Sequence, residues 1–235
     1  MMIVDREFIP FILMQRTHYM HRSFFYKALS KALRITGYTE YPSIVKANQL
    51  FNPGKIRDLY QADMEAEFSS ISGHIPYASS DILDIGSGIG GIDVLLAAHY
   101  RYAANIFLID KSVVDRNFHY GFEPNGSFYN SLTLSKKFLT TNGVPTNRIF
   151  LQEATPNYSI DFNTQFDLIL SFISWGFHYP VETYLNSVYE KLRTDGVCLL
   201  DIRNGTTGLE ILEKKFKSVK VIKDFGKYFR VLAIK

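Results

Sequence analysis

The 235-residue sequence has one cysteine and one tryptophan, and neither sign of charge is in large excess. A single cysteine, Cys198, excludes a disulfide within the chain, and its apolar neighbours predict a small buried side chain. This fits a reducing, cytoplasmic compartment. The net charge of +3 is too small to indicate a nucleic-acid binder, so we expect no nucleic-acid partner.

A long hydrophobic run is also missing. The apolar stretch 8–14 is interrupted by Pro10, follows three charged residues and is too short to cross a bilayer. We therefore expect a soluble protein with no integral membrane segment. The six histidines do not occur at metal-ligand spacing, so no dedicated metal site is expected. A magnesium ion held jointly by carboxylates and substrate would escape this test.

Hydrophobic residues make up 46% of the chain, enough to build a core. In residues 1–75 the apolar positions recur at helical spacing, which predicts helices over 17–36 and 56–70. Tyr41-Pro42-Ser43 and Asn52-Pro53-Gly54 indicate turns between them. We predict a helical N-terminal cap without strands over this region.

From Asp81 onward, short apolar runs alternate with helical patterns, as in a parallel sheet with crossover helices. Strands are expected at 81–85, 105–109, 149–151, 166–172 and 197–202, and helices at 91–100, 127–142 and 181–192. Two final runs, 217–223 and 227–234, are separated by only Asp224-Phe225-Gly226, which requires an antiparallel hairpin. We predict one α/β domain over residues 76–235.

The first expected strand is followed by Gly86-Ser87-Gly88-Ile89-Gly90-Gly91, which opens a helix. Glycines at such a turn let the backbone bend sharply and approach a ligand closely. The spacing Gly86-x-Gly88-x-x-Gly91 also satisfies the dinucleotide-binding pattern, so the glycines alone do not choose between cofactors. A tight turn without a ligand is a third interpretation.

Asp84, two residues before the first glycine, separates these interpretations. Its carboxylate would repel a pyrophosphate, whereas S-adenosylmethionine carries a sulfonium and an ammonium group. The order Asp84, Gly86, Gly88, Gly90 resembles the motif of class I S-adenosylmethionine-dependent methyltransferases. The resemblance implies S-adenosylmethionine as cofactor, S-adenosylhomocysteine as product, and a Rossmann-like sheet that ends in an antiparallel hairpin.

Two more acids follow expected strands. Asp110 ends the second strand, where an acid can accept both ribose hydroxyls of an adenosine, although NAD domains use the same device. A helix-capping aspartate is the structural alternative. Glu153-Ala154 resembles the family's acid-alanine step, which implies that Glu153 holds the adenine amino group. The alternative is an exposed loop glutamate without a binding role. The expected cofactor set also includes Ser87, Lys111 and Ser171.

The fourth expected strand runs into the segment 173–180. Ligands of open α/β sheets bind beyond the carboxyl ends of strands, near the switch in strand order. Methyl transfer to a hydroxyl requires removal of the hydroxyl proton, and His178 is the candidate general base because its ordinary pKa lies near neutrality. A structural histidine is the alternative. Trp175 and Tyr179 are expected to stack on an acceptor ring.

Two blocks carry a narrower resemblance: Trp175-Gly176-Phe177-His178-Tyr179-Pro180 and Tyr129-Asn130-Ser131-Leu132. Over about residues 50–235 the chain resembles sugar O-methyltransferases, including domains joined to glycosyltransferases in glycan-assembly proteins. The resemblance implies His178 as the base, Trp175 and Tyr129 in the acceptor pocket, and Asn130 bonded to cofactor or substrate. It also implies a small-molecule or glycan acceptor, with a deoxyhexose such as rhamnose as an example, and association with a glycosyltransferase domain.

Asp201 and Arg203 end the fifth expected strand, where they either reach the acceptor site or form a mutual or neighbouring ion pair. The segment 111–126 is long for a link between a strand and a helix. A lid over the site and an ordinary surface loop are both consistent with it.

Other functions remain open. A methyltransferase for another small hydroxylated metabolite would share the fold and motifs. An RNA methyltransferase is disfavoured by the low net charge and by the lack of an Asn/Asp-Pro-Pro-Tyr block after the fourth strand. NAD-dependent reductases usually carry a Tyr-x-x-x-Lys pair, and this chain has none in a suitable helix. That interpretation also leaves Asp84 unexplained. A non-catalytic subunit that binds S-adenosylmethionine is a further alternative.

Overall fold

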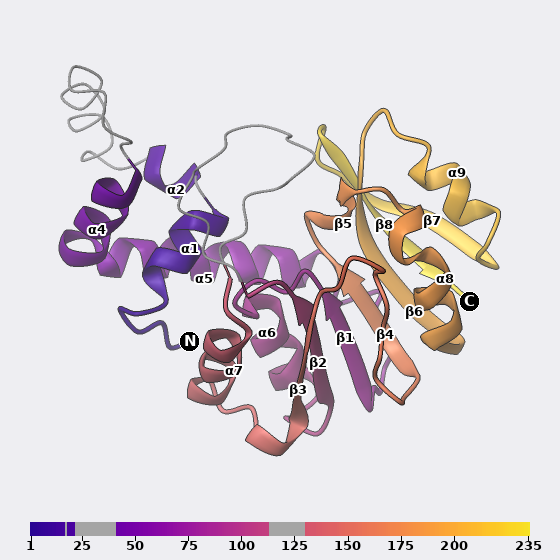
Figure 1. Ribbon diagram of the computed structural model, residues 1–235, viewed down its shortest axis with the longest axis horizontal. Helices are drawn as coiled ribbons and strands as arrows, with labels where there is room; N and C mark the ends of the chain where they lie inside the picture. Colours follow the sequence, from indigo (N-terminus) through magenta and orange to yellow (C-terminus); the bar gives the residue numbers. More distant parts are fainter. Residues whose placement is uncertain (17, 22–40, 113–129) are drawn as a thin grey trace.

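The computed structural model describes residues 1–16, 18–21, 41–112 and 130–235 (Figure 1). Tyr129, a predicted acceptor residue, lies outside the described residues. The same holds for most of the 111–126 segment and for most of the helix expected over 17–36.

A seven-stranded sheet forms the centre of the molecule, in the order β3-β2-β1-β4-β6-β8-β7. Its strands are β1 (Asp81–Ile85), β2 (Asn105–Asp110), β3 (Ile149–Glu153), β4 (Phe166–Ser171), β6 (Leu192–Arg203), β7 (Ser218–Asp224) and β8 (Tyr228–Ile234). The first five are parallel, β8 runs antiparallel to β6, and β7 runs antiparallel to β8. The predicted parallel strands and the terminal hairpin are thus confirmed.

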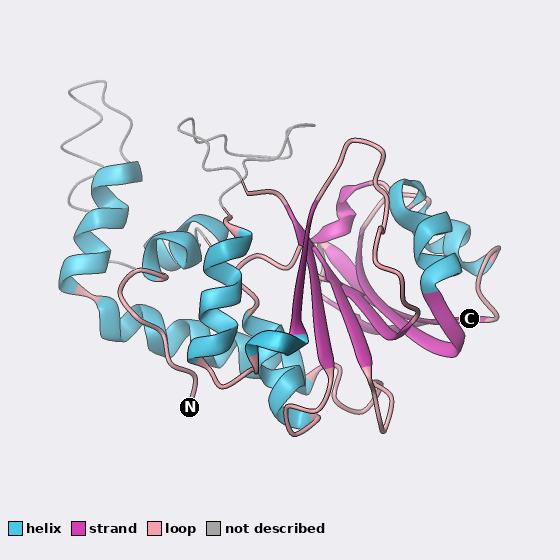
Figure 2. Cartoon of the chain, turned by 60° about the horizontal axis from the view of Figure 1, so that its bottom comes forward, coloured by secondary structure: helices cyan, strands magenta, loops and turns pink. Residues whose placement is uncertain are grey.

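Alternate residues of the central strands face opposite sides of the sheet, as the period of a strand requires. On β1, Ile82 packs into the core shared with α6 (Gly91–His99) and α7 (Leu132–Thr141). Its neighbour Leu83 packs into the core shared with α8 (Glu182–Lys191) and α9 (Gly208–Glu213). Figure 2 shows helices on both sides of the twisted sheet. The near-continuous apolar runs of the sequence follow from this double covering.

The regular elements among the described residues of the N-terminal part are all helices: α1 (Ile9–Gln15), α2 (His18–His21), α4 (Tyr41–Phe51) and α5 (Pro53–Ser69). Prolines lie in the first turns of α1, α4 and α5, where a missing N–H costs no hydrogen bond. The turn predicted at Tyr41-Pro42-Ser43 is therefore wrong, because these residues begin α4. Tyr60 and Met64 of α5 enter the same core as the sheet, so this region packs directly on the α/β part.

Several boundaries differ from the sequence expectation, among them the start of β6 at Leu192 and two that lie near the glycine turn. In the described residues α7 begins at Leu132, and the Ser131 hydroxyl accepts the Leu134 N–H at 3.4 Å as an N-cap. The segment after β4 is not a plain loop, because Ser174–Tyr179 forms an extended element, β5, outside the seven-stranded order. Ile173 adopts a left-handed φ of 54° and makes the break between β4 and β5. No helix in the described ranges has both the length and the apolar character to cross a bilayer.

Candidate active site

The turn between β1 and α6 has the conformation that its glycines allow. Gly86, Gly88 and Gly90 have φ values of 78°, 56° and 84°, a region that other residues rarely adopt. Space is equally restrictive: a Cβ on Gly86 would lie 2.0 Å from Ser174 Oγ of β5, and one on Gly88 would lie 2.7 Å from Gln15 Oε1 of α1. The predicted turn is present, and α1 and β5 lie against it.

Gly88 is held from both sides of its peptide. Its N–H donates to Asp110 Oδ2 at 2.7 Å, and its carbonyl accepts from Asn130 Nδ2 and Ser135 Oγ, each at 2.7 Å. The Lys111 N–H donates to Asp110 Oδ1 at 2.7 Å. Asn130 is 4% exposed and its side chain bonds the turn, whereas the resemblance implied a bond to cofactor or substrate. A carboxylate has about four acceptor sites, and Gly88, Lys111 and Asn130 are the donors to Asp110, so this carboxylate can accept a further hydrogen bond.

Burial raises the pKa of Asp110 to about 6, while the Gly88 and Lys111 N–H groups and the Asn130 side chain oppose this effect. The hydrogen bonds from these donors favour the ionised form. The acid predicted at the end of β2 therefore lies at the glycine turn, already oriented by the backbone.

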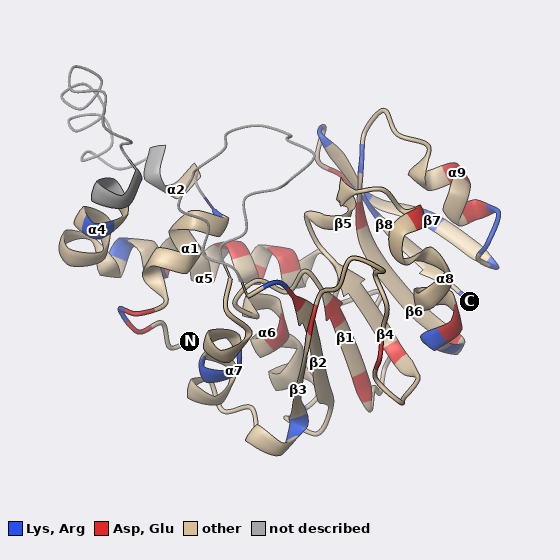
Figure 3. Cartoon of the chain, in the orientation of Figure 1, with Lys and Arg blue, Asp and Glu red and all other residues tan. Residues whose placement is uncertain are grey.

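A pair of acids lies beneath the turn. Asp84 on β1 is 3% exposed, and Asp93, in the first turn of α6, is fully buried. Neither oxygen of Asp93 has a hydrogen-bond partner of good geometry in the described part of the chain. The group facing it is the Asp84 carboxyl, and burial followed by the charge of Asp93 raises the pKa of Asp84 well above its usual range. Figure 3 shows acidic residues on α5 and at the ends of β2 and β3 around this edge.

On the other side of Asp110, the end of β3 is held by the backbone. The Ala154 N–H donates to the Asp110 carbonyl at 2.9 Å, which continues the pairing of β2 with β3. Glu153 is exposed, and its Oε2 accepts the Ser112 N–H at 2.9 Å. The structure thus brings Glu153 and Asp110 to one edge, as the sequence predicted, with Glu153 accessible to a ligand.

Tyr179 lies toward the Asp110 side of this edge. Its ring centroid is 6.1 Å from that of Tyr158, whose backbone has a left-handed φ of 52°. Burial raises the pKa of Tyr179 to about 12, with further contributions from Tyr158 and Asp110. The sequence assigned Tyr179 to the acceptor, whereas the structure places it near the acid expected to bind ribose.

Ser171 and Trp175 anchor β5 to the sheet. The Ser171 hydroxyl donates to the Ile85 carbonyl at 2.7 Å and accepts the Trp175 N–H at 2.9 Å. The Trp175 indole N–H donates to the Val181 carbonyl at 2.8 Å, and the ring is fully buried. In this arrangement Trp175 offers no open face to an acceptor. Both residues instead fix the position of the segment that carries His178.

His178 lies on β5 with its side chain exposed, beside Phe177 at a ring-centroid distance of 5.0 Å. Partial loss of hydration and the guanidinium of Arg203 lower the pKa of His178 below its usual value. A lowered pKa keeps the imidazole neutral near pH 7, the form that accepts a proton. The structure therefore brings together His178 and Arg203, two residues that the sequence assigned to the acceptor side.

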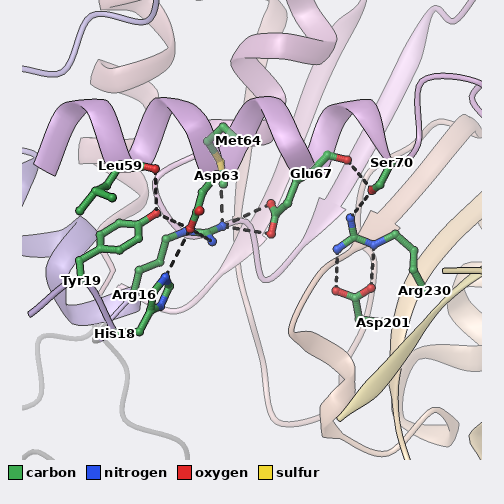
Figure 4. Close-up of polar contacts among 10 residues, drawn as sticks. All are labelled: Arg16, His18, Tyr19, Leu59, Asp63, Met64, Glu67, Ser70, Asp201 and Arg230. Atoms are coloured by element: carbon green, nitrogen blue, oxygen red, sulfur yellow. Dashed lines mark hydrogen bonds and ion pairs between the residues drawn. The ribbon is translucent and has the colours of Figure 1, made fainter. Parts of the chain in front are cut away.

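Asp201 forms a buried ion pair with Arg230 of β8 (Figure 4). The Arg230 Nε and one terminal nitrogen donate to the two Asp201 oxygens, each at 2.8 Å, and both residues are fully buried. Arg230 also donates to Ser70 Oγ at 2.8 Å, and its guanidinium carbon lies 3.7 Å from the Phe172 ring centroid. Asp201 thus pairs with a neighbouring strand and not with Arg203.

Helix α5 connects the N-terminal helices to this buried pair (Figure 4). Arg16 donates to Asp63 at 3.4 Å and to Glu67 at 3.3 Å, while Ser70 at the end of α5 accepts from Arg230. These contacts join residues far apart in the sequence. The helical cap is therefore tied to both the glycine turn and the ends of β6 and β8.

Sequence reasoning missed three residues of this region. Asp93 carries a readable signal, because it is the only charge between Gly91 and Ala98 in an apolar helix. Gln15 and Arg230 carry none, since their roles depend on contacts made only in the folded chain. In the described ranges no group of three or more His, Cys, Asp or Glu residues is arranged to hold a metal ion.

No protein-family model and no curated protein matches the chain. Among solved structures it is similar to precorrin-6y C5,15-methyltransferase from Geobacter metallireducens, with 18% identity, a TM-score of 0.50, and coverage of 73% of this chain and 89% of that one. A SAM-dependent O-methyltransferase from Thermotoga maritima is similar with 14% identity, a TM-score of 0.51, and coverage of 73% of this chain and 64% of that one. The StiE O-MT segment is similar with 14% identity, a TM-score of 0.53, and coverage of 79% of this chain and 80% of that one. The chain therefore has the class I methyltransferase fold.

Proposed function

We propose that the protein is an S-adenosylmethionine-dependent methyltransferase whose cofactor binds at the turn between β1 and α6. The observation that carries the proposal is the Gly86–Gly90 turn, with its left-handed glycines and the hydrogen bond from Gly88 to Asp110. An acid ends β2 and another ends β3, and the two are paired at the same edge of the sheet. This arrangement matches adenosine recognition at the carboxyl ends of parallel strands.

The chain's own groups fit the parts of such a cofactor. Asp110 would accept the ribose hydroxyls, Glu153 would accept the adenine amino group, and the acid at Asp84 would face the positively charged methionine end. The glycine turn offers a backbone without Cβ atoms for close approach, and Ser174 and Gln15 pack where side chains at Gly86 and Gly88 would lie. When bound, S-adenosylmethionine supplies a methyl carbon activated by its sulfonium.

The acceptor side is proposed at β5. His178 is exposed there, and its lowered pKa makes the neutral imidazole available to take a proton from an acceptor hydroxyl. Arg203 beside it carries a positive charge that favours the same neutral form. We propose O-methylation, with His178 as the general base.

A sugar hydroxyl is the acceptor that we propose, as part of a glycan or a small glycoside. The support is the resemblance of 175–180 and 129–132 to sugar O-methyltransferases, which also supports a partner glycosyltransferase. Cytoplasmic location and the lack of a nucleic-acid partner rest on the single cysteine and the low net charge. Other small hydroxylated metabolites are the alternative acceptors.

The test is transfer of a radiolabelled methyl group from S-adenosylmethionine to rhamnosyl, fucosyl and other glycosides. We expect product with at least one glycoside, and we expect His178→Ala to lower kcat by about two to four orders of magnitude while cofactor affinity is kept. His99→Ala is the matched control, because His99 is exposed at the far end of α6. Equal activity of the His178 variant and wild type would remove His178 as the base.

A further inference from the structure

Two carboxyl groups lie buried against each other beneath the glycine turn. Asp93 Oδ2 is 3.5 Å from the position of a Cβ on Gly90, so this carboxyl borders the turn directly. Its oxygens have no hydrogen-bond partner of good geometry in the described part of the chain, and the groups that act on this carboxyl are the Asp84 carboxyl and the N–H of Asp93 itself. Two carboxylates cannot hydrogen-bond to each other unless one of them carries a proton.

The surroundings add negative charge to this pair. After Asp93, the largest charges acting on Asp84 are those of Asp110 on β2 and Glu67 on α5. Tyr60 of α5 borders Gly91, and burial raises its pKa, so its hydroxyl is neutral. The nearby cation, Arg16, is bonded to Asp63 and Glu67. Nothing in this set offsets two buried negative charges, whose separation from water is costly.

Resting on the proposed function, we propose that Asp84 and Asp93 share one proton in the free protein and release it when S-adenosylmethionine places positive charge beside them. On binding, one carboxyl O–H bond breaks and its proton passes to the buffer. The dianionic pair then faces the ammonium or sulfonium of the cofactor. Asp93 thereby becomes a positioning residue of the cofactor site, and cofactor affinity becomes linked to pH.

The linkage has a fixed sign. Where the free pair holds its proton, a rise in pH removes the need to release it, so S-adenosylmethionine binds more tightly as pH rises. The limiting slope is about tenfold in Kd per pH unit for one proton. The α-amino group of the ligand has an ordinary pKa of about 8, so measurements below pH 7 keep it charged and leave the protein as the source of protons.

Calorimetry of S-adenosylmethionine binding to the whole chain tests the proposal at about pH 6 to 7, in buffers that differ in ionisation enthalpy. We expect release of up to one proton per cofactor and a Kd that falls as pH rises. Asp93→Asn should release markedly fewer protons, whereas Asp58→Asn, at an exposed acid on α5, should behave as wild type.

Cofactor binding to wild type without proton release, and with a Kd independent of pH, would overturn this inference while the proposed function stands. Absence of S-adenosylmethionine binding at every pH would instead end the proposed function. Because the wild-type measurement alone decides the proton count, the proposal stays testable even if the Asp93 variant fails to fold. Circular dichroism of each variant shows whether the variant is folded, and so distinguishes a loss of structure from a loss of proton release.

Discussion

The Gly88 N–H donates a 2.7 Å hydrogen bond to Asp110 Oδ2, which joins the turn after β1 to the end of β2. The same carboxylate accepts the Lys111 N–H through its other oxygen. One side chain thus fixes the shape of the turn and presents acceptors at its surface. This relationship makes the proposed cofactor site a single unit.

Asp110→Asn should weaken S-adenosylmethionine binding by roughly 10- to 100-fold. The amide keeps one acceptor and turns a donor toward either the backbone N–H or the ribose hydroxyl, and a hydrogen bond to a charged group contributes about 1.5–3 kcal/mol. Isothermal titration measures the loss, with Asp58→Asn as an exposed control. Unchanged affinity would show that Asp110 does not contact the cofactor.

Gly86→Ala should abolish cofactor binding, and Gly226→Ala should not. Both glycines have a φ of 78°, so alanine strains the two backbones alike. Only at Gly86 would the new Cβ meet Ser174, since nothing lies within 4 Å at Gly226. Binding isotherms of both variants distinguish the effect of the steric clash with Ser174 from the effect of backbone strain. Equal behaviour of the two would contradict a functional role for the tight packing at Gly86.

The rate of methyl transfer should rise with pH through the lowered pKa of His178 and level off near neutrality. The reason is that the neutral imidazole is the base, and Arg203 and partial burial keep it neutral. Arg203→Gln should move the acidic limb of the kcat/KM profile to higher pH, while Arg203→Lys, which keeps the charge, should leave it in place. A limb that does not respond to Arg203→Gln would assign the titration to another group.

Arg230→Ala should reduce the free energy of unfolding by about 3–5 kcal/mol, because it leaves the buried carboxylate of Asp201 without a partner. The matched control is Lys217→Ala, which breaks the exposed pair with Asp195 and should cost about 1 kcal/mol or less. Urea denaturation compares them. Similar losses for the two variants would mean that the Asp201 pair is not buried as described.

Asp93→Asn should stabilise the cofactor-free protein above about pH 5, as measured by thermal unfolding. Burial raises the folded-state pKa values of Asp84 and Asp93 above their unfolded values, so the folded chain binds more protons. Stability from this pair is therefore lost as pH rises from about 4 through the raised pKa values. The variant should show a flatter dependence on pH, and a slope equal to that of wild type would exclude a coupled pair.

The sequence predicted the strands of the sheet because they are buried on both faces and appear as apolar runs. It also predicted the glycine turn and Asp110, since both depend on local order along the chain. It did not predict β5, whose position depends on Ser171 and Trp175 contacts with the sheet. Arg230 and Ser70 are 160 residues apart, and no local pattern indicates such a contact.

Binding of S-adenosylmethionine is the central claim, and isothermal titration of the whole chain tests it most directly. The geometry of Asp84, the glycine turn and Asp110 predicts a Kd in the micromolar range for S-adenosylmethionine or S-adenosylhomocysteine. It predicts no binding of NADH, whose pyrophosphate would meet the acid at Asp84. Binding of NADH without binding of S-adenosylmethionine would contradict the account.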